Sequence, residues 1–447
     1  MMKNIILIIC LVFFTSCSKN YFALPSQDLN NYESNEFYIT KEVSQKLKEN
    51  YLKNLFYVWG IDKTNINMKN IANDILKDTG YGENYQLNSQ KLMQNIVDNA
   101  DFDNLNKISK NAIIIHSSNL RLLPTKKPRF KNPKLAGEGY PFDYLQNSFI
   151  YAYTPVKISH FSKDFGWSFI YNSVVVGFIE NKNIAFISDE DLNIYKSSKD
   201  FIMPKKDKIA LIDKNEDFIE YARIGMPLAL SKESANFYTI RVFKKDLNNN
   251  AKLIEIKVKK EDFFKLGDSF SSADLKKIAN ELIGQNYGWG GLNGDRDCSA
   301  FLKDVFGTFG VFLARNSQDQ IYQKDYLNRK IFFNISKLSN KQKYNYIKSN
   351  AIPFATLLAL KGHIVLYLGE FDNKIYILHN LWGIKNYERG VESRIIVGKV
   401  AITTIDAGKN LSSVKEQDVI LSRIFGMRNL FADELQFEIP NLNSNKD

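Results

Sequence analysis

The sequence predicts a multidomain α+β protein with a mainly helical N-terminal domain, two small β-barrels and a C-terminal α+β domain. The length of 447 residues allows two to four domains at roughly 100–200 residues per domain. Apolar residues recur at helical spacing over 31–108, and short apolar runs separated by Gly and Pro fill 109–265. Over 266–447 helical stripes precede strand-like runs, and helices that precede strands rather than alternate with them indicate the α+β class.

The composition excludes several classes of protein. Hydrophobic residues make up 44% of the chain and charged residues 24%, so the chain can bury a core, and disordered or low-complexity classes are excluded. Three cysteines are too few for a disulfide framework or a Cys-rich zinc module, and four histidines argue against a His-rich metal centre. We therefore predict no metal and no cofactor. The net charge of +11 fits an anionic partner such as nucleic acid, a membrane surface or a cell-wall polymer, without identifying one.

The N-terminus predicts export. A positively charged start precedes an apolar run over 5–14, which is shorter than the roughly 20 residues of a membrane span but suits a secretory signal. The run leads into Phe14-Thr15-Ser16-Cys17, which resembles a bacterial lipobox with Phe where Leu is usual. We predict a signal peptide over 1–16 and acylation of Cys17, which would anchor the protein on the periplasmic side of a bacterial membrane. Ser18 favours the outer membrane where a cell has two. An ordinary signal peptide with an incidental cysteine is the alternative, and export disfavours a nucleic-acid partner.

Four segments follow the signal peptide and precede the C-terminal domain. Residues 17–30 are polar and predict a tether. Residues 31–108 carry helical apolar stripes without chemistry-bearing clusters, which is typical of a stabilising domain. Residues 109–185 and 186–265 each contain four strand-like runs bounded by turn residues, which predicts two barrels of roughly 75 residues.

The C-terminal domain, 266–447, begins with two predicted helices. Ser271 and Asp274 have the spacing of a capping box, and Gly284 is a plausible end of the first helix. A second helix should begin near Cys298, because apolar residues at 302, 305, 306 and 309 fall on one face. The runs 363–368 and 374–380 are strand-like and separated by a polar connection, which predicts a hairpin.

The residues that can carry chemistry concentrate in this domain. Cys298 opens the predicted helix, where backbone N–H groups and the helix dipole favour a thiolate. The Gly-rich stretch over 287–291 lies just upstream and would let backbone approach the site closely. His363 and His379 lie on the two hairpin strands, so one could act as a base for Cys298 and the other could orient it. A structural cysteine is the commoner reading of Cys298 alone, and the conjunction with two histidines predicts a Cys–His enzyme.

The two histidines share a face of the sheet only if the strands pair with an even index sum. Pairing of His379 with His363, or with Val365, meets this condition. A two-residue turn at 372–373 would instead place His379 opposite Leu366, on the wrong face. We therefore predict a three- or five-residue loop, or a bulge that restores the parity.

Several motifs resemble those of the NlpC/P60 cysteine peptidases. Tyr287-Gly-Trp-Gly-Gly, then Asp297-Cys298-Ser299, Arg315-Asn316-Ser317 and Gly362-His363 resemble the family's motifs in order and spacing over about 266–410. Upstream, Arg121-Leu-Leu-Pro124 and the stretch 139–148 resemble a bacterial SH3 domain. The order of helical domain, two bacterial SH3 domains and peptidase resembles one subfamily of murein peptidases.

The resemblance implies a papain-like NlpC/P60 catalytic domain behind two SH3-like barrels, with no metal. It implies cleavage of the γ-D-glutamyl-diamino acid (diaminopimelate) bond of peptidoglycan stem peptides that have a free N-terminal L-Ala. Cys298 would be the nucleophile, His363 the base and His379 the orienting residue.

The resemblance also implies substrate-binding residues. Tyr287 would help to bind the oxyanion or the substrate, and Asp297 the ammonium group of L-Ala. Ser299 and Ser317 would hold the D-Glu carboxylate. Tyr144 is a candidate for the wall that the first SH3 domain builds beside the site, with barrel core as its alternative. We interpret Trp289 and Arg315 as structural.

Two other functions stay open at this point. A non-catalytic murein-binding lipoprotein would use its SH3 domains to hold the wall, although all three triad positions are present here. An acyltransferase or amidase could use the same Cys–His scaffold, because an acyl-enzyme can meet acceptors other than water. The predicted partners are peptidoglycan stem peptides and, through Cys17, a membrane; we predict a monomer.

Overall fold

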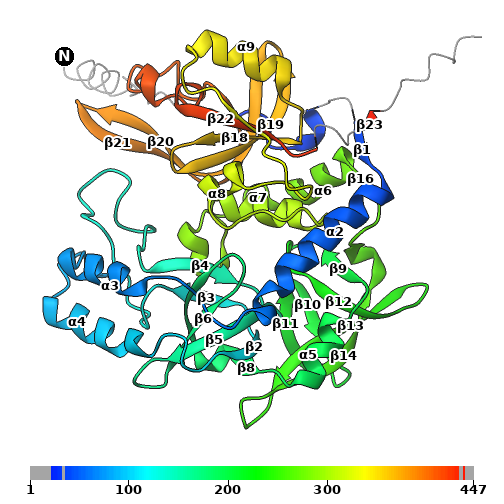
Figure 1. Cartoon of the computed structure of the whole chain (residues 1–447). Helices are drawn as coiled ribbons and strands as arrows, with labels where there is room; N and C mark the ends of the chain where they lie inside the picture. Colours follow the sequence, from blue (N-terminus) through cyan, green and yellow to red (C-terminus); the bar gives the residue numbers. More distant parts are fainter. Residues whose placement is uncertain (1–21, 33–35, 432–435, 438–447) are drawn as a thin grey trace, which may run out of the picture.

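A computed structural model describes residues 22–32, 36–431 and 436–437 (Figure 1). The predicted signal peptide and Cys17 lie outside these residues. Within the described part of the chain, no helix is both long and apolar enough to cross a membrane. The multidomain α+β class is confirmed: a helix–sheet domain lies above two β-domains in Figure 1, and N-terminal helices lie against all three.

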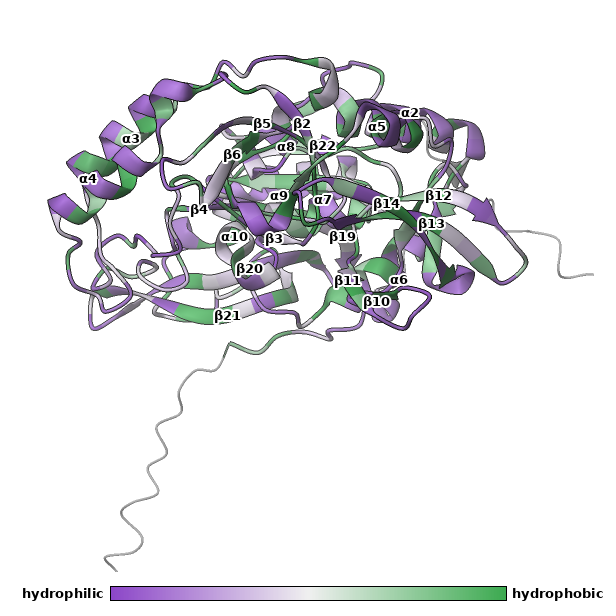
Figure 2. Ribbon diagram, turned by 90° about the horizontal axis from the view of Figure 1, so that it is seen from below, coloured by the Kyte–Doolittle hydropathy of each residue, from purple (hydrophilic) through white to green (hydrophobic). Residues whose placement is uncertain are grey.

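The N-terminal helices are amphipathic and pack on different neighbours. Helix α2 (Lys41–Phe56) begins at Thr40, whose side chain accepts a hydrogen bond from Val43 N, and it runs between the C-terminal domain and the second barrel (Figure 1). Helices α3 (Met68–Lys77) and α4 (Gln90–Asn99) lie at the edge of the molecule, with polar and apolar residues on separate sides (Figure 2). Their buried side chains join a cluster with core phenylalanines of the first barrel. The segment therefore stabilises its neighbours and has no core of its own.

Part of the predicted tether is packed instead of free. The Gln27 side chain donates to Ile402 O at 2.9 Å and accepts from Ile402 N at 3.0 Å, as an extra strand would. Leu29 is fully buried, and its backbone N–H donates to the Asn280 side chain. The expectation of a tether over 17–30 is therefore wrong for these residues, because a polar composition did not reveal their specific hydrogen bonds.

The two predicted barrels are antiparallel. The first forms a seven-stranded sheet in the order β4-β3-β7-β6-β5-β2-β8. Its strands are β2 (Lys110–Ile114), β3 (Ser118–Arg121), β4 (Gln146–Ile150), β5 (Pro155–Phe161), β6 (Trp167–Tyr171), β7 (Val176–Glu180) and β8 (Ile184–Phe186). The second forms the sheet β14-β13-β12-β9-β15 and the hairpin β10-β11. Its elements are α5 (Asp189–Lys196), β9 (Phe201–Pro204), β10 (Ile209–Ile212), β11 (Phe218–Ala222), β12 (Leu228–Glu233), β13 (Phe237–Lys245), β14 (Ala251–Lys259) and β15 (Phe263–Lys265).

The C-terminal domain is a six-stranded sheet, β17-β22-β18-β19-β20-β21, with helices on both faces. Its helices are α6 (Ser272–Leu282), α7 (Cys298–Gly307), α8 (Ser317–Tyr322), α9 (Asn340–Asn350) and α10 (Ile420–Arg423), with the short helical segment η6 (Trp289–Gly294). Its strands are β17 (Phe332–Asn334), β18 (Thr356–Leu360), β19 (His363–Phe371), β20 (Lys374–Glu388), β21 (Val391–Thr404) and β22 (Ile424–Asn429). The predicted capping box of Ser271 and Asp274 opens α6.

The core of this domain fixes the start of α7 against the sheet. Leu302, Val305, Phe306 and Phe309, the predicted apolar face, are all buried. They share a cluster with Ile364 and Leu366 of β19, whereas Val365 and Tyr367 pack with α9 on the other face. The alternation in β19 is the period of two expected of a strand covered on both faces. The packing of α7 against Ile364 and Leu366 places Cys298, the first residue of α7, beside the beginning of β19.

Candidate active site

The hairpin of β19 and β20 carries the two histidines on one face. The turn is two residues long, Asp372-Asn373, which alone would separate the histidines onto opposite faces. The register shifts between Tyr367 and Gly369, so that Leu368 is an extra residue on β19. This bulge restores the parity, as one of the predicted alternatives required, and the register Leu366 with Leu378 then brings His379 next to Val365.

A hydrogen-bonded chain orients the two imidazoles. His363 Nε2 lies 2.8 Å from His379 Nδ1, and His379 Nε2 lies 3.1 Å from Thr403 Oγ1 on β21. Two tautomer assignments satisfy both contacts, because the Thr403 hydroxyl can accept or donate. In the assignment that suits a base, His363 Nε2–H donates to His379 and His379 Nε2–H donates to Thr403, which leaves His363 Nδ1 able to accept a proton. Sequence reasoning missed Thr403, because the register of β21 depends on a long-range pairing.

Cys298 is the first residue of α7 and is almost fully buried. The backbone N–H of Ile364, next to His363, donates to its sulfur. Among the described residues no hydrogen bond joins the thiol to the His363 ring, but the Asp297 carboxylate acts electrostatically on both groups. The cysteine and the histidine thus lie around the same strand end. In many enzymes the hydrogen bond between the nucleophile and its base forms or shortens only when substrate binds.

Burial favours the neutral forms of both the thiol and the imidazole in this conformation. Burial, and then the adjacent Asp297 carboxylate, raise the pKa of Cys298 to about 12. Burial, and then the Arg423 cation, lower the pKa of His363 to about 3. Desolvation of the sulfur therefore opposes the thiolate that the backbone N–H groups of the helix N-terminus favour.

Cys298 faces a cavity of about 650 Å³ between the C-terminal domain and the first barrel, which we call the cysteine cavity. The structure brings all the predicted substrate-binding residues to its lining: Tyr287, Asp297, Ser299, Ser317 and Tyr144. Burial, and then proximity to Cys298, raise the pKa of Tyr287 well above its ordinary value, so its hydroxyl remains a donor. A tyrosine O–H beside the thiol can hydrogen bond an oxygen that gains negative charge there.

Arg315 already neutralises the Asp297 carboxylate. The guanidinium binds both carboxylate oxygens, at 2.7 and 3.1 Å, and its Nε donates to Ser148 of the first barrel at 2.8 Å. Asp297 also caps α7 by accepting from Ala300 N at 2.8 Å, and it accepts from the Ser299 hydroxyl at 3.0 Å. Burial would raise the pKa of Asp297, but Arg315 outweighs burial and holds it below the usual range. The carboxylate that we predict to meet the ammonium group of L-Ala therefore already has an internal cation.

The first barrel builds the opposite wall of the cysteine cavity. Tyr144 lies in this wall and contacts Trp289 at 5.7 Å between ring centroids, so it is not barrel core. The loop 172–176 supplies further lining that the sequence did not indicate. Gly290 and Gly291 have positive φ, and a Cβ at either position would overlap strand β4 of the barrel. These glycines, which the sequence predicted to let backbone approach the site closely, therefore serve a close approach between domains.

A buried ionic network lies behind the nucleophile and escaped sequence reasoning. Arg296 Nε donates to Asp304 of α7 at 2.7 Å, and its Nη atoms contact Asp207 of the second barrel at 3.0 and 3.2 Å. Arg223 binds the same Asp207 at 2.9 Å. The backbone oxygen of Arg296 accepts from the side chain of Asn380, next to His379. Arg296 therefore joins the second barrel to the nucleophile helix and to the histidine strand.

Among the described residues, no cluster of three or more His, Cys, Asp or Glu side chains could hold a metal ion. Cys298 is the free cysteine of the described part of the chain.

Four family models match the chain in the predicted order. The NLPC_P60 stabilising domain (N term) matches residues 6–105, the SH3 domain of SH3b1 type 128–180 and the SH3 domain of SH3b2 type 189–235. The NlpC/P60 family model matches residues 284–390, which contain Cys298, His363 and His379. The C-terminal domain of this chain is an NlpC/P60 domain.

Solved structures of the NlpC/P60 family align with most of the chain. A novel NlpC/P60 endopeptidase from Photobacterium damselae subsp. piscicida has 25% sequence identity and a TM-score of 0.78, over 91% of this chain and 98% of that chain. An NlpC/P60 family protein from Bacillus cereus has 14% identity and a TM-score of 0.44, over 72% of this chain and 99% of that chain. No curated protein matches the sequence. NlpC/P60 proteins are cysteine peptidases that hydrolyse peptidoglycan, and this chain carries their domain over residues 284–390.

Proposed function

We propose that this protein hydrolyses the γ-D-glutamyl-diamino acid (diaminopimelate) bond of peptidoglycan stem peptides that have a free N-terminal L-Ala. The observation that carries the proposal is the cysteine cavity, in which Cys298 lies beside Tyr287, Asp297 and Ser299 while the His363–His379 pair lies at the adjacent strand end. A nucleophile, a base with an orienting partner, and a hydroxyl donor are the parts that acyl transfer needs.

The proposed reaction starts from the neutral thiol. When substrate closes the contact, His363 Nδ1 takes the proton of Cys298, and the sulfur attacks the carbonyl carbon of the γ-glutamyl bond. The Tyr287 hydroxyl donates to the oxygen that becomes negative. The imidazolium returns its proton to the departing amine of the diamino acid, which leaves a thioester on Cys298. Water, deprotonated by His363, then hydrolyses the thioester and releases the γ-glutamyl carboxylate.

The same cavity supports the proposed substrate class. Ser317 presents to it a hydroxyl group that can donate to a D-Glu carboxylate, and Ser299 can do the same when its hydroxyl turns away from Asp297, to which it donates in this conformation. Asp297 with Arg315 forms a polar, nearly neutral end for the L-Ala residue, and Tyr144 in the barrel wall limits the room beyond it. We expect N-acetylation of L-Ala to slow cleavage at least about tenfold, because the acetyl group adds bulk and leaves a desolvated polar mismatch, which alone costs about 1–3 kcal/mol.

A digest of defined peptides tests the function. The full-length chain is incubated with L-Ala-γ-D-Glu-diaminopimelate, with its N-acetylated form and with an amine acceptor, and the products are weighed by mass spectrometry. Release of L-Ala-D-Glu that is lost in Cys298→Ser supports the proposal. An uncut peptide that still binds favours a murein-binding protein, and transfer to the amine in preference to water favours an acyltransferase.

We further propose that the protein is exported, that Cys17 is acylated and that the enzyme acts from the periplasmic side of a bacterial membrane. The support is the resemblance of Phe14-Thr15-Ser16-Cys17 to a lipobox after an apolar run. Labelling of wild type but not of Cys17→Ser with a fatty-acid analogue is the expected result, and equal labelling would contradict acylation at this residue.

A further inference from the structure

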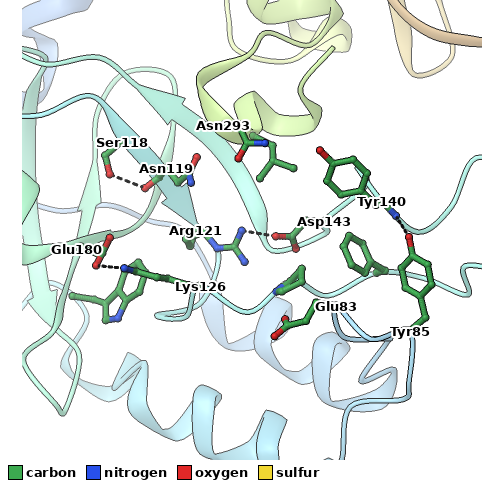
Figure 3. Close-up of a pocket in the computed structure, with 14 residues that line it drawn as sticks. Glu83, Tyr85, Ser118, Asn119, Arg121, Lys126, Tyr140, Asp143, Glu180 and Asn293 are labelled. Atoms are coloured by element: carbon green, nitrogen blue, oxygen red, sulfur yellow. Dashed lines mark hydrogen bonds and ion pairs between the residues drawn. The ribbon is translucent and has the colours of Figure 1, made fainter. Parts of the chain in front are cut away.

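A second cavity of about 660 Å³ lies beyond the cysteine cavity and has no role in the proposed reaction (Figure 3). Three parts of the chain line it: the loop 83–85 of the N-terminal segment, strands and loops of the first barrel, and Leu292 and Asn293 of η6. Its volume lies within the roughly 300–1,000 Å³ that is usual for small-molecule sites. We call it the second cavity.

The charged groups of the second cavity neutralise one another. Arg121 binds Asp143 at 2.5 Å, and both side chains are almost fully buried at the centre of the cavity (Figure 3). Lys126 binds Glu180 at 2.9 Å on one side, and Glu83 is paired with Lys127 at 3.7 Å. A lining in which each acid meets a base does not favour an ionic ligand, since no charge is left to compensate one. The lining suits a neutral polar molecule.

Aromatic rings form the side of the cavity opposite Lys126. Tyr85 and Tyr140 are 45% and 58% exposed, and Tyr85 Oη accepts from Tyr140 N at 3.3 Å (Figure 3). Tyr85 has a φ of 58°, which is unusual for an aromatic residue. Trp167 lines the cavity from the barrel on the side of Glu180, its partner across strands β6 and β7. The Tyr85 ring packs edge-on against Phe130, and the exposed parts of the rings offer apolar faces to the cavity.

Side-chain amides lie between these rings and the charged pairs. Asn119 Oδ1 accepts from Gln146 Nε2 at 3.0 Å, and within the described part of the chain no group accepts from its Nδ2. Asn293, also with positive φ, has an exposed side chain that forms no hydrogen bond to the described residues. Amide groups of this kind can pair with an amide on a ligand.

The two cavities share a wall. Gln146 lines the cysteine cavity, accepts from Arg121 at 3.1 Å and donates to Gly290 O at 3.1 Å. The loop η6 presents Trp289 and Gly290 to the cysteine cavity, and Leu292 and Asn293 to the second cavity. A ligand in the second cavity therefore touches the loop that follows Tyr287.

We propose that the second cavity binds a neutral N-acetylated amino-sugar chain, with sugar rings against Tyr85, Tyr140 and Trp167 and acetamido groups near Asn119 and Asn293. Flat apolar rings suit the C–H faces of a sugar, paired charges suit its hydroxyl groups, and amides suit its acetamido groups. The link to glycan strands of peptidoglycan rests on the proposed function, whereas the binding of the sugar chain does not. The cavity would hold a strand while the cysteine cavity acts on a peptide.

The test is direct binding of chitotetraose, a neutral chain of N-acetylglucosamine, to the full-length protein by titration calorimetry. Cellotetraose, which lacks the acetamido groups, and a neutral tetrapeptide are the comparison ligands. We expect chitotetraose to bind and cellotetraose to bind at least about threefold more weakly, as the loss of one hydrogen bond predicts. Tyr140→Ala should weaken chitotetraose binding at least about fivefold. Asn119→Ala should reduce the preference for chitotetraose over cellotetraose, and Tyr221→Ala, at an equally exposed ring outside the cavity, should change neither affinity.

Three outcomes would overturn the proposal: no binding of chitotetraose by the wild type, equal affinity of wild type, Tyr140→Ala and Asn119→Ala, or tighter binding of the tetrapeptide at the same residues. Thermal unfolding of each variant shows whether it is folded, and the two substitutions test different walls, so one misfolded variant leaves the other informative. The titrations are repeated on Cys298→Ser. Failure of the proposed peptidase would leave sugar binding unchanged, and failure of sugar binding would leave peptide cleavage unchanged.

Discussion

His363 Nε2 and His379 Nδ1 lie 2.8 Å apart although the strands do not pair these two residues directly. The contact depends on the bulge at Leu368, because the two-residue turn alone would send the rings to opposite faces. The row of hydrogen bonds continues from His379 Nε2 to Thr403 Oγ1 at 3.1 Å. If these hydrogen bonds orient His363, substitution of His379 or Thr403 should affect turnover without affecting substrate binding, since neither residue lines the cysteine cavity.

We therefore expect His379→Ala to lower kcat by about 10²–10⁴ and Thr403→Val by about two- to tenfold, with KM nearly unchanged in both. Thr403→Ser, which keeps the hydroxyl, should restore kcat. Steady-state cleavage of the defined stem peptide measures both constants. A rise in KM with constant kcat in either variant would contradict an orienting role.

The second prediction concerns the charge of the resting thiol. With the pKa of Cys298 raised to about 12 and that of His363 lowered to about 3, the free enzyme holds a thiol and a neutral imidazole between these pH values. Alkylation of Cys298 by iodoacetamide should therefore be slow at pH 7 and rise steadily to pH 10, because thiolate is the reacting form. The label is quantified by mass spectrometry, with Cys298→Ala as the blank. A fast rate that is already constant at pH 6–7 would show a resting ion pair instead.

Acid should destabilise the protein through His379. Burial, and then the neighbouring His363, hold the pKa of His379 well below its ordinary value, so the folded state stays neutral where the unfolded state takes up a proton near pH 6.5. A lowered folded-state pKa gives stability above the unfolded value that is lost as pH falls. The free energy of unfolding should decrease below pH 6.5 by up to about 1.4 kcal/mol per pH unit from this group. Urea unfolding at pH 7 and pH 5 measures it, and His379→Asn should show a smaller difference; an equal difference would rule out this group.

Arg315 and Asp297 should be strongly coupled in stability. Arg315→Met leaves a buried carboxylate unpaired and should lower the free energy of unfolding by about 3–5 kcal/mol. Asp297→Asn in the same chain removes that charge and keeps a capping residue for α7, so the double variant should be more stable than Arg315→Met alone. Urea unfolding of the four proteins gives the coupling free energy. Additive effects would mean that the bidentate contact contributes little.

Breaking the buried ionic network behind Cys298 should also lower the stability of the protein, because this network joins the second barrel to the C-terminal domain. Asp207→Asn removes the carboxylate shared by Arg296 and Arg223, all three nearly inaccessible to solvent, and should lower the free energy of unfolding by about 3–5 kcal/mol. Asp103→Asn, at an exposed ion pair with Lys69, should change it by at most about 1 kcal/mol. Equally small changes in the free energy of unfolding for Asp207→Asn and Asp103→Asn would show that the buried network does not stabilise the contact between the domains.

Local patterns in the sequence predicted much of this site. The apolar face of α7, the capping box at Ser271 and the parity constraint on the histidines follow from periods of 3.6 and 2 within short windows, and the structure has all three. The pKa of Cys298 could not be predicted in this way, because its burial depends on elements far apart in sequence. The same holds for Arg315 against Asp297, and for Thr403, whose strand position is set by the whole sheet. Gln27 shows the limit most simply: a polar residue in a polar segment pairs with a backbone 375 residues away.

The contact between Arg296 and Asp207 also affects how mutations in this gene should be interpreted. Four family models divide the chain into consecutive units, which suggests that each unit could be lost or exchanged by itself. The second barrel, however, supplies the counter-charge for the residue two positions before the nucleophile. In a genetic screen for loss of activity, substitutions at Asp207 and Arg223 would score with those at Cys298, and a protein shortened by that barrel would behave as a null allele.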